Sequence, residues 1–206
     1  IEAIAELYLC GIISQDGLFD ESMMGRSNRI IKEGRTCSYL LHKGEPELRI
    51  TQNDIRAIQL AKAALYAGIR LLMDHLGIEE VERIRLAGAF GSHIDVKYAM
   101  ILGLIPDCDL DHVSSAGNAA GTGARMALLN HESRREIEET VRKIEKVETA
   151  VEPAFQQHFV DAMAIPHKHA PSTHLQKTVS LPEAKNNAQG NGDSTSRRRR
   201  SKRVVA

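Results

Sequence analysis

Two segments decide the fold: residues 84–91, IRLAGAFG, and residues 112–123, HVSSAGNAAGTG. Each begins with a short strand-like run, breaks at glycine and continues into residues that favour a helix, so each predicts a strand, a glycine turn and a helix. Glycine at such a turn permits backbone angles closed to other residues and lets a ligand approach the main chain. The helix start also leaves N–H groups free to bind anionic or polar groups. We expect the two turns to form facing walls of one cleft.

A purely structural interpretation of these glycines stays open at this point. Glycine after a strand is often only a tight connection, and Gly121 and Gly123 inside a helix often mark close helix packing. Spacing alone favours neither interpretation. The patterns G-x-G-x-x-G and G-x-x-x-x-G-K-[ST] do not occur at these turns, so neither a Rossmann dinucleotide site nor a P-loop is predicted.

The composition is typical of an aliphatic domain rich in helices. The 206 residues suffice for one sizeable domain with an appendage, and they are 42% hydrophobic but only 4% aromatic, with no Trp. No apolar run approaches the roughly 20 residues that span a bilayer, and no secretory signal is present. Cys10, Cys37 and Cys108 lie far apart without a C-x-x-C motif. This spacing argues against a disulfide framework or a metal site made by this chain alone, and we expect reduced thiols in a cytoplasmic protein.

The net charge of zero hides an asymmetry between two parts of the chain. Residues 167–206 contain nine Lys and Arg against two acidic residues, a net charge of +7, so residues 1–166 carry −7. The same 40 residues hold few large apolar side chains and are rich in Asn, Gln, Ser, Pro and Gly. We predict a folded domain over residues 1–166 and a disordered basic tail over residues 167–206.

Two motifs in this tail have a functional and a simpler interpretation. Residues 197–203, RRRRSKR, are a candidate for binding nucleic acid or anionic lipid, and His167, His169 and His174 for binding a metal loosely. The simpler interpretations, a solubilising extension and exposed histidines, are preferred.

Periodicity elsewhere predicts helices and one hairpin. Helical spacing of apolar residues predicts helices over residues 1–10, 51–76, 95–102, 119–129, 132–143 and 153–163. Residues 37–42 and 48–51 flank the turn KGEP and predict a hairpin, and residues 147–150 predict one more short strand. The chain starts at Ile1 in mid-helix without Met or a capping residue, which indicates a fragment of a longer protein.

The helix over residues 51–76 is the longest predicted element. Thr51 and Asp54 match a variant of the capping box, and Gly77 ends the helix. Gln59 and Lys62 are expected on a solvated face. The apolar stripe expected to face the core consists of Ile55, Ile58, Leu65, Ile69, Leu72 and Leu76. The small residues that make the middle of the helix slim are Ala61, Ala63, Ala64, Ala67 and Gly68. In the helix over residues 132–143 and just beyond, the expected inner face is Ile137, Val141 and Ile144.

Residues 86–91, LAGAFG, and residues 117–128, GNAAGTGARMAL, resemble the large C-terminal domain of reductive activators of corrinoid proteins. Four further segments resemble this family: ITQNDIR at 50–56, QLAKAA at 59–64, ILGLIP at 101–106 and FQ at 155–156. The resemblance spans nearly all of residues 1–165 and is specific in the order of its motifs. The tail does not take part in it.

This resemblance implies an α/β fold related to the acetate and sugar kinase, heat-shock chaperone and actin superfamily. The chain would be part of an actin-like, ribonuclease-H-like ATPase domain with short strands, glycine turns and packed helices. In that superfamily the nucleotide lies between two subdomains, and a glycine turn contacts the adenosine. By resemblance, the residues that contact the adenosine of ATP are Gly88, Ala89, Gly91, Gly117, Asn118 and Gly121. Ala89 stands where the superfamily often has a second glycine, and uncharged turns suit a base and ribose better than a triphosphate.

The resemblance also implies groups that this chain does not itself hold. The superfamily binds its phosphates and magnesium with D-x-G-x-[ST] hairpins, and no such hairpin occurs in this sequence. The family's two-iron two-sulfur cluster is expected only in the missing N-terminal region, which is ferredoxin-like. No catalytic or metal-ligating residue is expected here, and the fragment alone is expected neither to hydrolyse ATP nor to transfer electrons.

The leading hypothesis is that the full-length protein couples ATP to the one-electron reduction of a corrinoid protein in a methyltransferase system, from cobalt(II) to cobalt(I). The fragment would supply the adenosine side of the cleft and a partner surface. The alternative is a non-catalytic docking or dimerisation module that binds a corrinoid protein or a second copy. A third hypothesis is nucleic-acid binding through the arginine tail. No membrane partner is expected.

Overall fold

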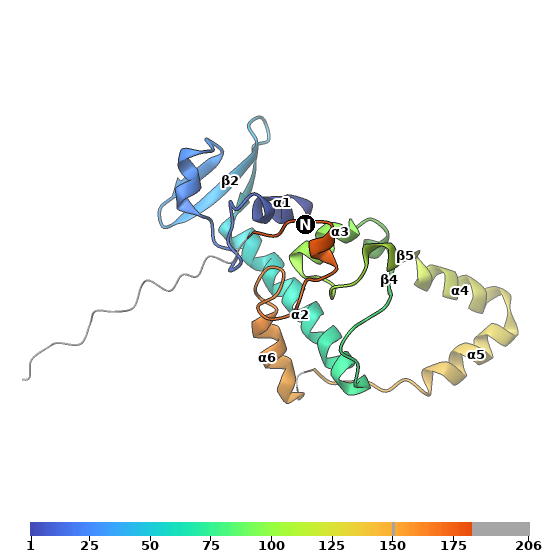
Figure 1. Ribbon diagram of the computed structural model, residues 1–206. Helices are drawn as coiled ribbons and strands as arrows, with labels where there is room; N and C mark the ends of the chain where they lie inside the picture. Colours follow the sequence, from blue (N-terminus) through green and yellow to red (C-terminus); the bar gives the residue numbers. More distant parts are fainter. Residues whose placement is uncertain (150, 183–206) are drawn as a thin grey trace, which may run out of the picture.

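The computed structural model describes residues 1–149 and 151–182, and its elements lie around one long central helix, α2 (Gln52–Leu76) (Figure 1). A three-stranded antiparallel sheet, in the order β1-β2-β3, lies near the start of α2, and a parallel pair, β4-β5, lies away from that sheet. The other helices and strands are α1 (Glu2–Leu9), β1 (Ile30–Glu33), β2 (Thr36–His42), β3 (Leu48–Thr51), β4 (Ile84–Ala87), α3 (Val96–Leu102), β5 (Val113–Gly117), α4 (Ala119–Leu129), α5 (His131–Val141) and α6 (Pro153–Asp161). The short 3-10 helices are η1 (Glu21–Gly25), η2 (Phe90–Ser92), η3 (Leu110–His112) and η4 (Leu175–Lys177).

Helix α2 begins and ends where its capping residues predict. The backbone N–H of Asp54 donates to the Thr51 hydroxyl, and the Asp54 carboxylate accepts from the Thr51 N–H at 2.8 Å, which completes the capping box. Gly77 follows in the left-handed conformation with φ 66°. This conformation is costly for residues with a Cβ, so glycine ends the helix cleanly.

The face of α2 that is buried differs from the predicted one. Leu65 and Leu72 on the predicted stripe are about half exposed, at 49% and 51%. The buried face shares Ile55 with the predicted stripe, and its other members are Gln59, Lys62, Ala63, Tyr66, Ala67, Leu71 and Met73. The expectation that Gln59 and Lys62 are solvated was therefore wrong. Helix α6 packs along α2, where the small Ala63 lies in a buried cluster with Tyr66 of α2 and Ala162 just after α6.

The segment that follows α6 explains why polar side chains of α2 are buried. The Lys62 ammonium donates to the carbonyl oxygens of Ala164 and Pro166, and the Gln59 amide donates to Met163 O at 3.0 Å. Buried carbonyl groups without partners are costly, so these side chains act as donors for a backbone segment outside any helix or sheet. Burial lowers the pKa of Lys62 to about 7.

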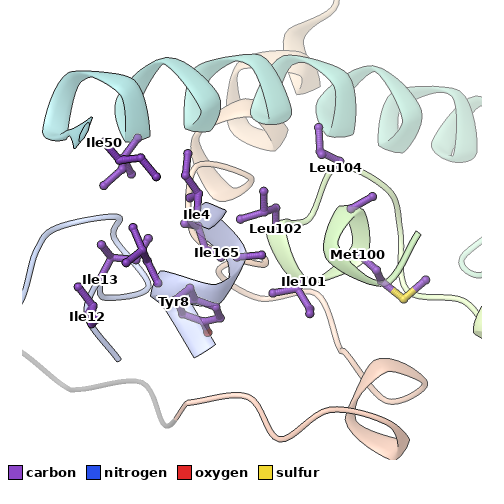
Figure 2. Close-up of a cluster of buried hydrophobic side chains, with 14 of the residues drawn as sticks. Ile4, Tyr8, Ile12, Ile13, Ile50, Met100, Ile101, Leu102, Leu104 and Ile165 are labelled. Atoms are coloured by element: carbon purple, nitrogen blue, oxygen red, sulfur yellow. The ribbon is translucent and has the colours of Figure 1, made fainter. Parts of the chain in front are cut away.

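The main core lies between α1, α3 and the start of α2. Figure 2 shows part of it: Ile4 of α1, Leu102 of α3 and Ile165 of the segment after α6 meet below α2. Strands β1, β2 and β3 add Ile30, Cys37 and Ile50. Because these side chains come from segments far apart in the sequence, the core joins the N-terminal and C-terminal parts of the chain.

Residues 167–182 are packed against the body, so the predicted boundary at residue 166 does not mark the end of the ordered chain. Leu175 is only 1% exposed and belongs to the main core. The Asp107 carboxylate accepts the backbone N–H groups of His174 and Leu175 at 2.8 and 2.9 Å. One buried leucine contributes about 2 kcal/mol, which helps an otherwise polar segment to order. The basic run at 197–203 lies outside the described residues.

Most of the predicted elements are confirmed within a few residues. Strands β2 and β3 form the predicted hairpin, with His42 opposite Leu48, and β1 is an additional strand that was not predicted. Residues 147–149 are not in a strand, and position 150 lies outside the described residues. The expected inner face of α5 was wrong, because Ile137, Val141 and Ile144 are all exposed. Helices α4 and α5 project away from α2 (Figure 1). No helix among the described residues is long and apolar enough to cross a membrane.

The segment after α6 is expected to make stability depend on pH. The Nδ1 atom of His167 accepts the backbone N–H groups of His169 and Ala170, which requires a neutral ring. Burial, and next the charge of Lys62, lower the pKa of His167 to about 4; His169 and His158 act in the same direction, and the Asp161 carboxylate opposes them. The unfolded chain then binds a proton below pH 6.5 that the folded chain does not, so stability is lost as pH falls from 6.5 towards 4.

Urea unfolding at pH 7 and pH 5 is the measurement that checks this dependence. The loss between these two values should amount to about 1–2 kcal/mol for this group. His167→Gln should flatten the dependence, whereas His131→Gln, on the exposed start of α5, should leave it as in the parent chain. An equally steep dependence in His167→Gln would contradict the assignment.

Candidate functional site

The two glycine turns lie side by side at one end of the parallel strands β4 and β5. The strand register pairs Ile84 with Val113 and Ala87 with Gly117. Just beyond it, the Gly88 N–H donates to the Gly117 carbonyl at 2.8 Å. The two turns therefore lie side by side on one surface at the carboxyl ends of two adjacent strands, whereas the sequence had predicted facing walls of a cleft. In open α/β sheets this is the edge where ligands bind.

Gly88 and Gly117 are the two turn residues that face open space. Their φ angles are +102° and +64°, values that residues with a Cβ rarely adopt. A Cβ placed on either residue would have no heavy atom within 4 Å. Both turns thus present bare main chain to the outside, which is the arrangement that a planar ligand can approach closely.

A Cβ at Gly91 or Gly121 would meet other atoms of the protein, in contrast to a Cβ at Gly88 or Gly117. A Cβ on Gly91 would lie 2.9 Å from the Leu86 Cβ, and one on Gly121 would lie 2.7 Å from the Asn118 amide nitrogen. Gly91 is therefore a packing position, because backbone atoms of Leu86 also lie within 3.2 Å, whereas at Gly121 the nearest atoms are the end of the exposed Asn118 side chain. Gly123, in contrast, has no neighbour within 4 Å of a Cβ, so the expected close helix packing does not occur there.

Asn118 and Asp95 both cap helices. The Asn118 side-chain oxygen accepts the Gly121 N–H at 2.9 Å at the start of α4, and Asp95 accepts the Tyr98 N–H at 3.1 Å at the start of α3. Asn118 is exposed beside the Gly117 turn, and Ala89 is exposed beside Gly88. Five of the six predicted residues thus lie in or next to the paired turns, and Gly91 packs behind them.

Two serines that the sequence analysis did not single out hold the turns in shape. The Ser92 hydroxyl donates to the Gly88 carbonyl at 3.0 Å, and the Ser115 hydroxyl accepts the Gly117 N–H at 3.1 Å. The sequence feature that could have predicted this role is a serine close to a glycine turn, because a serine hydroxyl often takes the place of a backbone hydrogen-bond partner. Gly88, Ala89, Gly117 and Asn118 carry no charge, a property that suits a base and ribose better than phosphates.

The three cysteines do not form a cluster site. Cys10 is exposed at the end of α1, whereas Cys37 lies in β2 and Cys108 in the loop before η3, both buried. Within the described ranges, no group of three or more His, Cys, Asp or Glu side chains is arranged to hold a metal ion. The residues present therefore do not fit an iron–sulfur cluster, and no electron-transfer step is assigned to them.

Paired strand-turn-helix units whose glycine turns meet at the carboxyl ends of two parallel strands define a module of the α/β class. The particular family follows from comparison with known proteins. The model of the C-terminal domain of RACo, the ASKHA domain, matches residues 1–176. The chain belongs to this family, and its mixture of small sheets and packed helices is the corresponding part of an actin-like fold.

Two relatives are similar over most of the chain. The corrinoid activation enzyme RamQ of Eubacterium limosum is 37% identical over 172 residues, which are 78% of this chain and 29% of RamQ. The solved structure of a reductive activator for corrinoid, iron-sulfur protein is 32% identical, with a TM-score of 0.72, over 82% of this chain and 28% of that one. The chain thus spans less than a third of the length of either relative.

Two glycine substitutions test how these turns are packed. Gly91→Ala should destabilise the fold by about 1–3 kcal/mol, because its Cβ meets Leu86 too closely. Gly123→Ala should stabilise α4 by up to about 1 kcal/mol, because alanine favours a helix and the position is open. Thermal unfolding followed by circular dichroism measures both changes. Equal effects of the two substitutions would contradict the described packing.

Proposed function

We propose that this chain is the C-terminal part of an ATP-dependent reductive activator, which returns an oxidised corrinoid protein of a methyltransferase system from cobalt(II) to cobalt(I). The chain's own role is to supply the adenosine side of the nucleotide cleft. The observation that carries the proposal is the hydrogen bond from Gly88 to Gly117, which joins two uncharged, open turns into one surface. Membership of the ASKHA family and the two relatives named for corrinoid activation support it.

The residues of this chain have distinct tasks in the proposed cleft. The main chain at Gly88 and Gly117 contacts the base and ribose, and Ala89 adds a small apolar surface. Asn118 holds the start of α4, while Gly91 and Gly121 keep the turns compact. Bound ATP would supply free energy by binding two conformations of the full protein with different affinity.

The rest of the proposed activity belongs to parts of a longer protein. Phosphates and magnesium are bound there by hairpins that this chain lacks. A two-iron two-sulfur cluster, held outside these 206 residues by a ferredoxin-like region, would supply the electron that reduces cobalt(II). A cytoplasmic location fits this chemistry, because thiols and low-potential clusters persist in a reducing compartment.

Nucleotide titration tests the cleft directly in this chain. A fluorescent ATP analogue should bind saturably, and Gly117→Ala should weaken binding by about tenfold or more, because a side chain then intrudes at the contact surface. Gly34→Ala is the matched control: Gly34 has φ +64°, as Gly117 does, and also faces open space, but lies in the β1–β2 turn. Both variants carry the same backbone strain.

The comparison of the two variants separates a binding effect from a folding effect. Weaker binding in Gly117→Ala alone supports the cleft. Equal weakening in both variants would assign the effect to lost stability, and unchanged affinity in Gly117→Ala would sink the proposal for this turn.

A second candidate function, a docking or dimerisation module, is favoured by the exposed face of α2. A groove of about 330 Å³ runs along Ala64, Leu65, Gly68 and Leu72, and Val147 closes one side. Leu60 and Leu76 extend the same apolar surface and are 46% and 73% exposed. Clustered apolar side chains of this size on a surface often mark a protein interface.

Sedimentation at several protein concentrations tests this candidate. If α2 pairs with a second copy, Leu65→Lys should shift the association to at least about tenfold higher concentration, because a charge then enters the apolar groove. Leu48→Lys on β3 is the matched control, since Leu48 is 51% exposed and Leu65 is 49% exposed. A parent chain that stays monomeric at every concentration, or equal effects of both variants, would argue against the dimer.

A further inference from the structure

A pocket of about 330 Å³ lies on another part of the molecule, far in sequence from the glycine turns. Its walls come from the end of α1, the loop over residues 11–20 and η1, and Pro182 lines it from the C-terminal segment. Pockets that hold small molecules begin at about this volume. The glycine turns do not contribute to it, so this pocket is separate from the proposed nucleotide site.

The loop that forms this pocket is held in a defined shape. The Ser14 N–H donates to the Leu18 carbonyl at 2.8 Å, and Ile13 and Phe19 form a β-bridge. Two glutamines of α2 then fix the loop from behind: Gln52 donates to Gly17 O at 2.7 Å and Gln59 to Asp16 O at 3.0 Å. A ligand would therefore meet a preformed site and would not have to order the loop.

Tyr8 supplies a hydroxyl without a partner in the described part of the chain at this pocket. Its side chain is 4% exposed, and the residue lines the cavity. Figure 2 shows Tyr8 on the side of α1 that faces away from α2. Its hydroxyl makes no hydrogen bond within residues 1–149 and 151–182. The hydroxyl oxygen is not among the fully buried atoms that lack a partner, so the tip of this otherwise buried side chain is open to solvent and free to bond a ligand in the pocket. Burial raises the pKa of Tyr8 to about 12, which keeps the hydroxyl neutral.

The charges around the pocket are all negative. Asp16, Asp20 and Glu21 line it, and none of the described lining residues is Lys, Arg or His. Asp20 accepts from Ser22 at 2.9 Å, and Glu21 pairs with Lys32 at 2.6 Å outside the pocket. The Asp16 carboxylate has neither an ion pair nor a hydrogen bond in the described part of the chain. Asp16 is exposed at the pocket, so its carboxylate is free to accept hydrogen bonds from a ligand.

We propose that this pocket binds a small organic cation, a guanidinium or a primary ammonium group carried on a short apolar body. The N–H groups of the cation reach the Asp16 carboxylate and the Tyr8 hydroxyl. The apolar body rests on Leu18 and Phe19, which also line the pocket. This site is independent of the proposed nucleotide cleft, and neither proposal depends on the other.

The cationic group that binds in this pocket can come from two sources. One is a free small molecule, and the other is an arginine of the chain itself, because Arg197 follows fifteen residues after Pro182. Fifteen residues span up to about 50 Å, so the basic run can reach the pocket. The experiment below distinguishes the two sources.

Calorimetric titration of agmatine into the full chain tests the site. Asp16→Asn should weaken binding by about fivefold or more, and Tyr8→Phe by about threefold. Asp111→Asn on η3 and Tyr39→Phe on β2 are the matched controls and should bind as the parent chain does. Tyr8→Phe should not lower the stability of the ligand-free chain, because it removes a hydroxyl without a partner.

A chain with Arg197→Gln, Arg198→Gln, Arg199→Gln and Arg200→Gln separates the two sources. Tighter agmatine binding in this variant means that the basic run competes for the pocket, and equal affinity means that the site takes a free cation. Both outcomes support the cation site. Absence of saturable binding in both chains, or affinity that Asp16→Asn and Tyr8→Phe leave unchanged, would overturn it.

Discussion

The structure depends on a buried set of donors on one face of α2. Lys62 and Gln59 donate to carbonyl oxygens of the segment after α6, and Gln59 also donates to the loop that follows α1. Two segments of the chain that are distant in sequence are thereby tied to one helix. Burying a lysine costs free energy, which a satisfied set of hydrogen bonds partly offsets. The orientation of α2 follows, because its polar face must point inward.

That orientation determines which surfaces remain open. With Lys62 and Gln59 inside, Leu65 and Leu72 are left on the outside of α2. At the other end of the molecule, the parallel pair β4-β5 has only two strands, and among the described residues of α4 none is buried. The proposed adenosine surface is therefore one wall of a cleft. This chain covers only 28% of the length of the solved relative. We therefore expect the opposite wall of the proposed cleft to lie in the remaining part of such proteins.

The candidate site was predictable from the sequence to a large extent, and the role of each glycine was not. Gly88 and Gly117 follow strand-like runs, and the backbone conformation that such turns require selects glycine. Gly91 follows the same local pattern, yet the space beside it is filled by Leu86. A sequence states that a residue lacks a side chain, but only the neighbours of that residue show whether the space is open or filled.

The sequence by itself determined the local elements: the capping box and terminal glycine of α2, the hairpin of β2 and β3, and the two strand-turn-helix units. These depend on interactions between residues within a few positions of each other, so periodicity and capping report them. Only the tertiary structure decided which face of α2 is buried, that residues 167–182 pack on the body, and that α5 is exposed. Each of these depends on a partner far away in sequence, such as the carbonyl groups after α6 or Asp107 beneath η4. The hydrophobic pattern of a helix shows which face is apolar. Which face is buried also depends on whether distant carbonyl groups need hydrogen-bond donors from that helix.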